Sequence, residues 1–100
     1  MSIDPRTPVI TGVGITSPFG LGKAAFYQGI QAGRSATSAV TLVKSDGLKS
    51  RAVGEVKSLN PLDFLEPKEA ARVPRVVPMA ISAAKEAFAD AGMDPSKFTL

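Results

Sequence analysis

The sequence predicts an α/β fold in which a mixed sheet packs against helices, and the sheet is incomplete within these 100 residues. A near-continuous β-branched run over residues 8–15 is typical of a strand buried on both faces of a parallel or mixed sheet. An alanine-rich stretch before Gly92 repeats apolar residues at spacings of three and four, which is the period of an amphipathic helix. The two patterns lie at opposite ends of the chain.

The composition excludes several classes of function. The chain has no cysteine and no histidine, so it cannot form a disulfide or a thiolate metal site, and it lacks the commonest acid–base side chain. A self-contained hydrolase triad or zinc site is therefore not expected. The net charge of +3, the single Tyr and the absence of Trp do not support nucleic-acid binding. No uncharged run is long enough to span a bilayer and no secretory signal is present, so we expect a cytoplasmic protein with no membrane partner.

The first predicted strand contains two glycines, Gly12 and Gly14, which imply close approach by another backbone. Their spacing is that of the first two glycines of a dinucleotide-binding fingerprint, but Ser17 stands where the third glycine belongs. Pro18 then delays the following helix, so the helix amides would not meet the glycine turn. Tight packing is favoured over nucleotide binding.

The middle of the chain is predicted to hold one short helix and one short strand. The helix spans roughly residues 22–32 and ends before Gly33, which suits the residue after a helix. Residues 34–50 are predicted to form a long polar connection, and residues 51–56 a short strand.

The final helix carries a predicted apolar stripe and a proline near its start. It begins either at Pro78 or near Arg72 with a kink, because a proline inside a helix removes a hydrogen bond. Asp90 lies near its C-terminal end, where a negative charge opposes the helix dipole. Residues 97–100 are predicted to begin another strand. The stripe consists of Val73, Val77, Ala80, Ile81, Ala84, Phe88 and Ala91.

Four collinear stretches resemble the N-terminal portion of β-ketoacyl-ACP synthases, where ACP is the acyl carrier protein. VITGVG at residues 9–14, followed by SPFG at 17–20, resembles the opening of that family. FYQGIQAG at 26–33 resembles its first helix, and AVGEV at 52–56 resembles its next strand. Residues 68–92 resemble its long alanine-rich helix. Each motif is weak alone, but together they cover nearly the whole chain in the family's order.

The resemblance implies a thiolase-like fold of two similar α/β halves, of which residues 1–100 form the N-terminal segment of the first half without a complete domain boundary. It implies decarboxylative Claisen condensation of an acyl thioester with malonyl-ACP, in fatty acid or polyketide synthesis, without an organic cofactor or a metal. A homodimer, or a heterodimer with another condensing-enzyme subunit, is expected. The family's catalytic cysteine and histidines lie beyond position 100, so no catalytic residue is assigned in this chain.

The resemblance also implies a docking surface for the carrier protein. Basic residues before and at the start of the alanine-rich helix contact the acidic carrier in related synthases, and Lys68, Arg72 and Arg75 match that neighbourhood. Three cations within eight residues can steer an acidic partner whatever the family. The same pattern also fits an ordinary solvated helix face. Pro74 departs from the family, which usually has an aspartate before the equivalent arginine.

Three interpretations stay open on the sequence alone. The chain is the N-terminal quarter of a condensing enzyme, or it belongs to a non-catalytic subunit of the chain-length-factor type that binds a partner synthase and the carrier. It could also be a 100-residue binding module, but the open sheet edge of so small an α/β unit would invite aggregation. The residue at the family's nucleophile position would discriminate the first two interpretations.

Overall fold

The computed structural model describes residues 2–97 and confirms an α/β arrangement with two small sheets. Two-stranded antiparallel sheets are formed by β1 with β2 and by β3 with β4. The elements in chain order are β1 (Thr16–Ser17), β2 (Gly20–Leu21), α1 (Lys23–Gln31), β3 (Thr37–Ala39), β4 (Ala52–Gly54), the 3-10 turn η1 (Pro61–Asp63), α2 (Pro67–Ala70), α3 (Val76–Asp90) and the 3-10 turn η2 (Pro95–Lys97).

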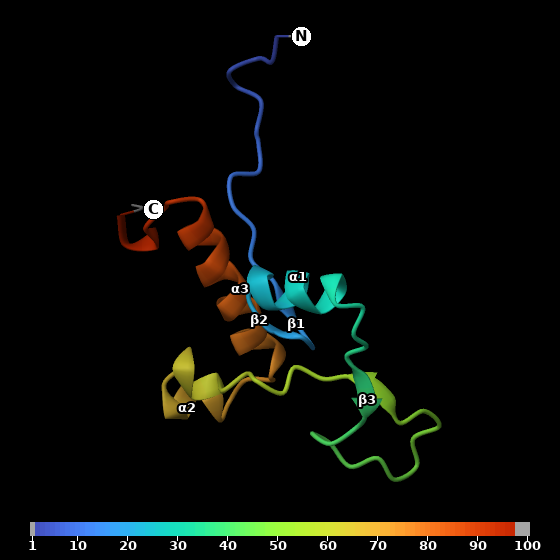
Figure 1. Ribbon diagram of the computed structural model, residues 1–100. Helices are drawn as coiled ribbons and strands as arrows, with labels where there is room; N and C mark the ends of the chain where they lie inside the picture. Colours follow the sequence, from blue (N-terminus) through green and yellow to red (C-terminus); the bar gives the residue numbers. More distant parts are fainter. Residues whose placement is uncertain (1, 98–100) are drawn as a thin grey trace.

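The elements form an open arrangement around α3 (Figure 1). The first sheet and α1 lie beside α3, and the N-terminal segment projects away from them. The hairpin of β3 and β4 and the short helix α2 lie toward the other end of the molecule. The radius of gyration is 17.3 Å, whereas a compact domain of this length has about 13 Å. The residues described therefore enclose little core of their own.

The predicted buried strand over residues 8–15 is wrong for this structure. A strand forms only at Thr16–Ser17, where Thr16 pairs with Leu21 across a tight hairpin. Val9 and Ile10 are 68% and 87% exposed. β-Branched residues favour an extended backbone, but a strand also needs a neighbour, and residues 2–97 supply none beside positions 8–13.

The predicted close approach at Gly12 and Gly14 is confirmed, and the approaching backbone belongs to α3. A Cβ atom at Gly12 would collide with the carbonyl oxygen of Ala87, and one at Gly14 would collide with that of Ala83. Ala83 and Ala87 lie one helical turn apart on α3, and this spacing matches the two-residue step between Gly12 and Gly14 on the extended segment. The glycines thus allow backbone-to-backbone packing between the two ends of the chain.

The predicted first helix is confirmed as α1. It ends at Gln31, and Gly33 takes the positive φ of 66° that suits a glycine after a helix. Gly29 is buried because the ring of Phe19 lies against its backbone, leaving no room for a Cβ atom. The hairpin turn therefore packs directly on α1.

The second sheet was only half predicted. β4 lies inside the expected strand at residues 51–56, but the supposed polar connection at 34–50 contains its partner, β3. Thr37 pairs with Gly54 and Ala39 with Ala52. Of this segment only Thr37 favours a strand, since alanine is depleted in strands, so pairing with β4 rather than local preference makes it a strand.

The long helix begins at Val76, so both predicted starting points are wrong. Pro78 lies in the first turn, where amide hydrogens have no partner within the helix, so its missing hydrogen costs nothing and no kink is needed. Pro78 and Ser82 are buried, whereas Ala80 and Ala84 of the predicted stripe are exposed. At the C-terminal end, Lys97 closes η2, and the rest of the predicted strand at 98–100 lies outside the described residues.

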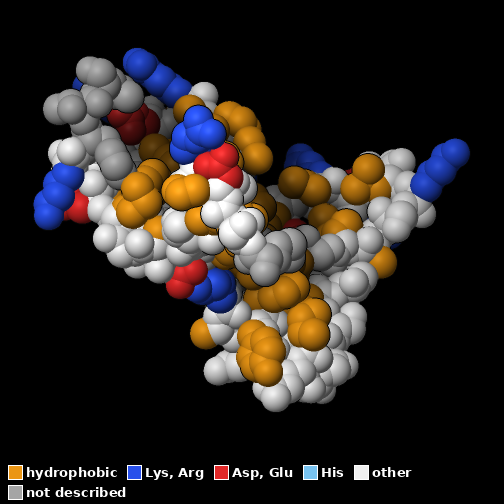
Figure 2. Space-filling view, turned by 90° about the horizontal axis from the view of Figure 1, so that it is seen from above, with side chains coloured by type: hydrophobic (Ala, Val, Ile, Leu, Met, Phe, Trp, Pro, Cys, Tyr) orange, Lys and Arg blue, Asp and Glu red, His pale blue; other side chains and the backbone are white. Residues whose placement is uncertain are grey.

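Much apolar surface is exposed. Among residues 2–97, Val56 and Leu59 are buried, at 7% and 5% exposure, together with the ring of Pro78. Figure 2, which views the molecule from the side on which the N-terminal segment projects, shows apolar side chains interspersed with charged ones across this face. No helix in the described part of the chain is long and apolar enough to cross a membrane.

Candidate functional site

A carboxylate from α3 joins the two N-terminal elements. Glu86 accepts a hydrogen bond from the amide of Ile15 through Oε1 at 2.8 Å, and from the amide of Lys23 through Oε2 at 2.9 Å. The second bond satisfies one of the free amides at the N-terminus of α1, where a negative charge also suits the helix dipole. A side chain 63 residues away in sequence thus acts as the cap that Gly22 cannot provide.

Asp90 acts in the same way one turn further along α3. Its carboxylate accepts a hydrogen bond from the amide of Val13 at 3.0 Å and pairs with the ammonium of Lys23. The Lys23 hydrogen bond, and then the Val13 amide, hold the pKa of Asp90 below its ordinary value. This contact explains an aspartate at the unfavourable end of a helix, which the sequence alone did not. Both carboxylates therefore serve the framework.

The basic segment, defined here as residues 66–75, contains α2 and the turn that leads to α3. Pro67 occupies the first turn of α2, where a missing amide hydrogen is tolerated. Lys68 and Arg72 are both exposed, four residues apart. Neither side chain has a hydrogen bond or an ion pair within residues 2–97. The structure thus presents two of the three predicted docking cations to solvent.

Arg75 lies differently from the other two cations. It is the N-cap residue of α3, and it is partly buried. Its Nη2 donates hydrogen bonds to the carbonyl oxygens of Val56 and Leu59, the latter at 3.2 Å. The guanidinium therefore connects the start of α3 to the backbone of Val56 and Leu59, whose side chains are buried, and nothing in the sequence pattern signals this contact.

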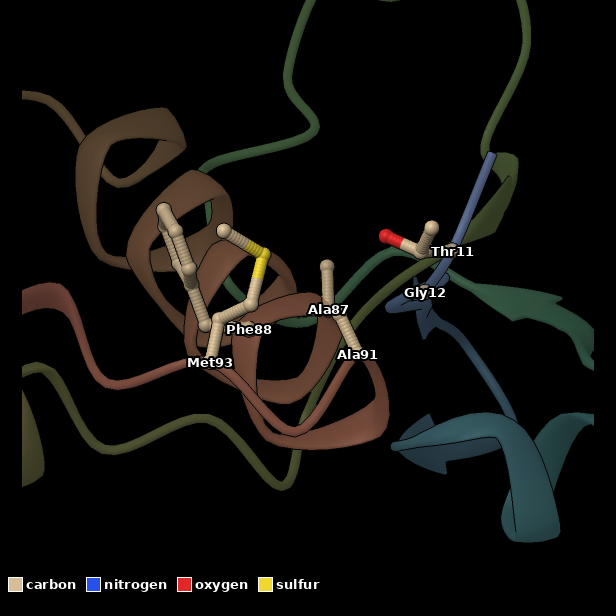
Figure 3. A pocket seen from close by; sticks show the side chains of 6 residues that line it. All are labelled: Thr11, Gly12, Ala87, Phe88, Ala91 and Met93. Atoms are coloured by element: carbon tan, nitrogen blue, oxygen red, sulfur yellow. The ribbon is translucent and has the colours of Figure 1, made fainter. Parts of the chain in front are cut away.

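Two hollows formed by residues 2–97 have linings that are poor in catalytic groups. The first hollow, of about 150 Å³, lies beside the last turns of α3. Figure 3 shows that Ala87 and Ala91 lie toward Gly12, whereas Phe88 and Met93 lie farther from it. Its lining has no ionisable side chain and includes one hydroxyl group, that of Thr11. It therefore offers no acid, base or charged ligand.

The second hollow, of about 310 Å³, is an apolar groove between the β3–β4 hairpin and α3. Two charged residues line it, Glu55 and Arg75. The Glu55 carboxylate accepts hydrogen bonds from the Leu42 amide at 2.7 Å and from the amide and hydroxyl of Thr41. The Leu42 bond is the main reason why the pKa of Glu55 is lowered. Both charges are thus occupied in holding loops together.

Comparison with known proteins identifies the family. Residues 7–99 match the Beta-ketoacyl synthase, N-terminal domain. The match covers most of the chain, so the protein belongs to the β-ketoacyl synthase family, and the resemblance seen in the sequence is confirmed.

Individual relatives agree with this assignment. The chain is 38% identical over 89 residues to the Tetracenomycin polyketide synthase ketoacyl synthase alpha subunit of Streptomyces glaucescens, which is 88% of this chain and 21% of that protein. It is 31% identical to a 3-oxoacyl-[acyl-carrier-protein] synthase 2 of Synechocystis sp., over 90% of this chain and 22% of that protein.

A solved structure agrees as well. The ishigamide ketosynthase/chain length factor superposes with a TM-score of 0.69 at 28% identity, covering 90% of this chain and 22% of the other. The thiolase-like fold expected from the resemblance is thereby supported for this N-terminal region. The chain spans about a fifth of the length of the proteins that it matches.

Proposed function

We propose that this chain is the N-terminal part of a β-ketoacyl-ACP synthase, an acyltransferase of fatty acid or polyketide synthesis. In the proposed reaction an acyl group is held as a thioester on a cysteine, and malonyl-ACP loses carbon dioxide. The resulting carbanion attacks the thioester carbonyl, a carbon–carbon bond forms, and the cysteine thiolate leaves. The observation that carries this proposal is the family match over residues 7–99.

Within that enzyme the chain would supply framework and docking surface rather than the reacting groups. It contains no cysteine or histidine, so the nucleophile and the groups that stabilise the oxyanion would come from other residues. We propose that residues 1–100 form the N-terminal segment of the first thiolase-like half. The packing of Gly12 and Gly14 on α3, locked by Glu86 and Asp90, would be the part of the framework built here.

A non-catalytic subunit of the chain-length-factor type is the second candidate. Its support is the similarity to the ishigamide ketosynthase/chain length factor, which is named for both kinds of subunit and so fits this candidate and the enzyme equally. Such a subunit would form a heterodimer with an active synthase, whereas the enzyme itself could pair with a second copy. The family match is shared by both candidates.

An acyl-loading experiment on the intact protein distinguishes the two candidates. The protein is incubated with a radiolabelled acyl-ACP, and the label retained after denaturation is measured together with carbon dioxide release from malonyl-ACP. Retained label and carbon dioxide release are expected of the enzyme. A protein that binds ACP but retains no label would support the non-catalytic candidate, and one that does neither would contradict both.

We further propose that Lys68 and Arg72 dock the acyl carrier protein. Support comes from their exposure, their spacing on one short segment, and the lack of a partner within residues 2–97. Carboxylates on an acidic partner would pair with both cations and accelerate association. The sequence also predicts a contact between Arg75 and the carrier. Because Nη2 of Arg75 already donates to backbone carbonyls, the docking proposal rests on Lys68 and Arg72.

Charge reversal tests the docking surface. The double variant Lys68→Glu/Arg72→Glu of the intact protein should bind ACP on the order of tenfold more weakly at low salt. The difference should shrink at physiological salt, where the screening length falls below about 10 Å. Lys44→Glu/Lys49→Glu is the matched control, because it makes the same charge change in the exposed loop between β3 and β4. Equal weakening in both variants would show that net charge, not this surface, controls binding.

A further inference from the structure

The stretch that carries the docking cations is tied internally but weakly to the rest of the molecule. Every hydrogen bond made by residues 60–72 joins two residues within that stretch, as in the bond from the Asp63 amide to the Asn60 carbonyl. A cation–π contact reaches α3, where the Lys85 ammonium lies 5.5 Å from the centre of the Phe64 ring. Within residues 2–97, no hydrogen bond therefore fixes α2 against the rest of the molecule except through the two ends of this stretch.

Arg75 holds both ends together. The carbonyls that it binds, on Val56 and Leu59, immediately precede the stretch, and Arg75 itself follows it. The two bonds connect residues 19 and 16 positions apart and so close a loop that contains η1, α2 and the exposed cations. The side chains of Val56 and Leu59 are buried, so the closed base of the loop is anchored in the small core.

We infer that Arg75 is a positioning residue for carrier docking: its guanidinium closes the loop of residues 57–74 and thereby holds Lys68 and Arg72 in a fixed orientation. This inference rests on the proposed docking function. Hydrogen bonds from a guanidinium to carbonyl oxygens are charge-assisted and stronger than neutral ones. A lysine could reach one carbonyl as a point charge, but it lacks the planar array of donors.

The inference differs from a direct contact in what it predicts for combined substitutions. If Arg75 and Arg72 each touch the carrier independently, their effects on affinity should add. If Arg75 positions Arg72, the effect of losing Arg72 should be smaller once Arg75 is gone. Removing the clamp should also loosen residues 60–72 when no carrier is present, which loss of a contact residue would not do.

The experiment measures ACP affinity and amide hydrogen exchange in the intact protein for Arg75→Gln, Arg72→Gln and the double variant. Arg75→Gln should bind ACP on the order of three- to tenfold more weakly, and its effect should be less than additive with that of Arg72→Gln. Exchange across residues 60–72 should accelerate in Arg75→Gln without carrier. Arg51→Gln, which removes an exposed guanidinium of the same charge, is the control and should change neither quantity.

Arg75→Lys is a second variant in case Arg75→Gln does not fold, because it keeps the positive charge at this position. It should show faster exchange and weaker binding, in the same direction as Arg75→Gln but smaller. Additive affinity losses with unchanged exchange would overturn the inference and favour direct contact. If the wild type binds no ACP, the docking proposal fails. In that event accelerated exchange in Arg75→Gln would still support the clamp, and unchanged exchange would overturn it.

Discussion

Replacing Gly14 with alanine should disrupt the packing between α3 and the segment that enters β1. The added methyl group would collide with the carbonyl oxygen of Ala83, and it would stand 2.7 Å from the Ala83 carbonyl carbon and 2.9 Å from the Ala87 amide nitrogen. All three atoms belong to the helix backbone, which cannot rotate away as a flexible side chain could. Relief requires the helix and the segment to separate.

Separation would also strain the hydrogen bonds on either side of Gly14. The Val13 amide is bonded to Asp90 and the Ile15 amide to Glu86. Overpacking a well-packed site typically costs 1–3 kcal/mol, occasionally more. Because the obstruction is backbone and two bonds flank it, we expect Gly14→Ala to lower the free energy of unfolding by about 3 kcal/mol.

The assay is denaturant unfolding of the intact protein, with thermal unfolding as a second probe. Gly47→Ala is the control: no atom lies within 4 Å of its Cβ position, and its φ of 83° makes the cost a backbone one of roughly 1 kcal/mol. Ala83→Gly should not rescue Gly14→Ala, since the collision is with the carbonyl rather than the methyl group. A Gly14→Ala protein within 0.5 kcal/mol of wild type would refute the packing argument.

Two further predictions concern the carboxylates of α3. Glu86→Gln should lower the free energy of unfolding by about 1–3 kcal/mol, because the oxygen of the new side chain can accept from only one of the Ile15 and Lys23 amides and its NH2 group would face the other donor. Hydrogen exchange at those two amides measures the loss, and unchanged protection at both would contradict the prediction. The lowered pKa of Asp90 means that its contacts with Lys23 and Val13 stabilise the fold above the carboxyl's unfolded pKa, and that this contribution disappears as the pH falls through the lowered folded value. The melting temperature of Asp90→Asn should therefore be lower than that of the wild type near neutral pH and equal to it in strong acid. A difference in melting temperature that persists in acid would refute this role of Asp90.

Local signals predicted the elements whose cause is local. The 3.6-residue period and the glycines at 33 and 92 correctly located α1 and the end of α3, because helix hydrogen bonds and left-handed end residues lie close in sequence. The predicted starts of α3, at Pro78 or near Arg72, are both wrong, because the first turn of a helix tolerates a proline without a kink and α3 begins at Val76. β3 was missed because a Thr-Ser-Ala strand owes its state to its partner, β4.

The candidate site was predicted in composition but not in arrangement. The sequence identified Lys68, Arg72 and Arg75 as one basic cluster. The structure exposes the first two and turns Nη2 of Arg75 toward backbone carbonyls. Charge and spacing cannot distinguish a cation that faces solvent from one that bonds internally, because both satisfy the same one-dimensional pattern.

The sequence by itself determined the family, the alanine-rich helix and the need for glycine at positions 12 and 14. These follow from residue types whose consequences hold wherever they occur: a missing Cβ atom permits close backbone approach, and alanine makes a narrow helix. Only the tertiary structure decided that this approach is to α3, and that Glu86 and Asp90 bind amides 71 and 77 residues away. Contacts over such separations leave no periodic trace in the sequence, because they depend on where the folded chain brings two surfaces together.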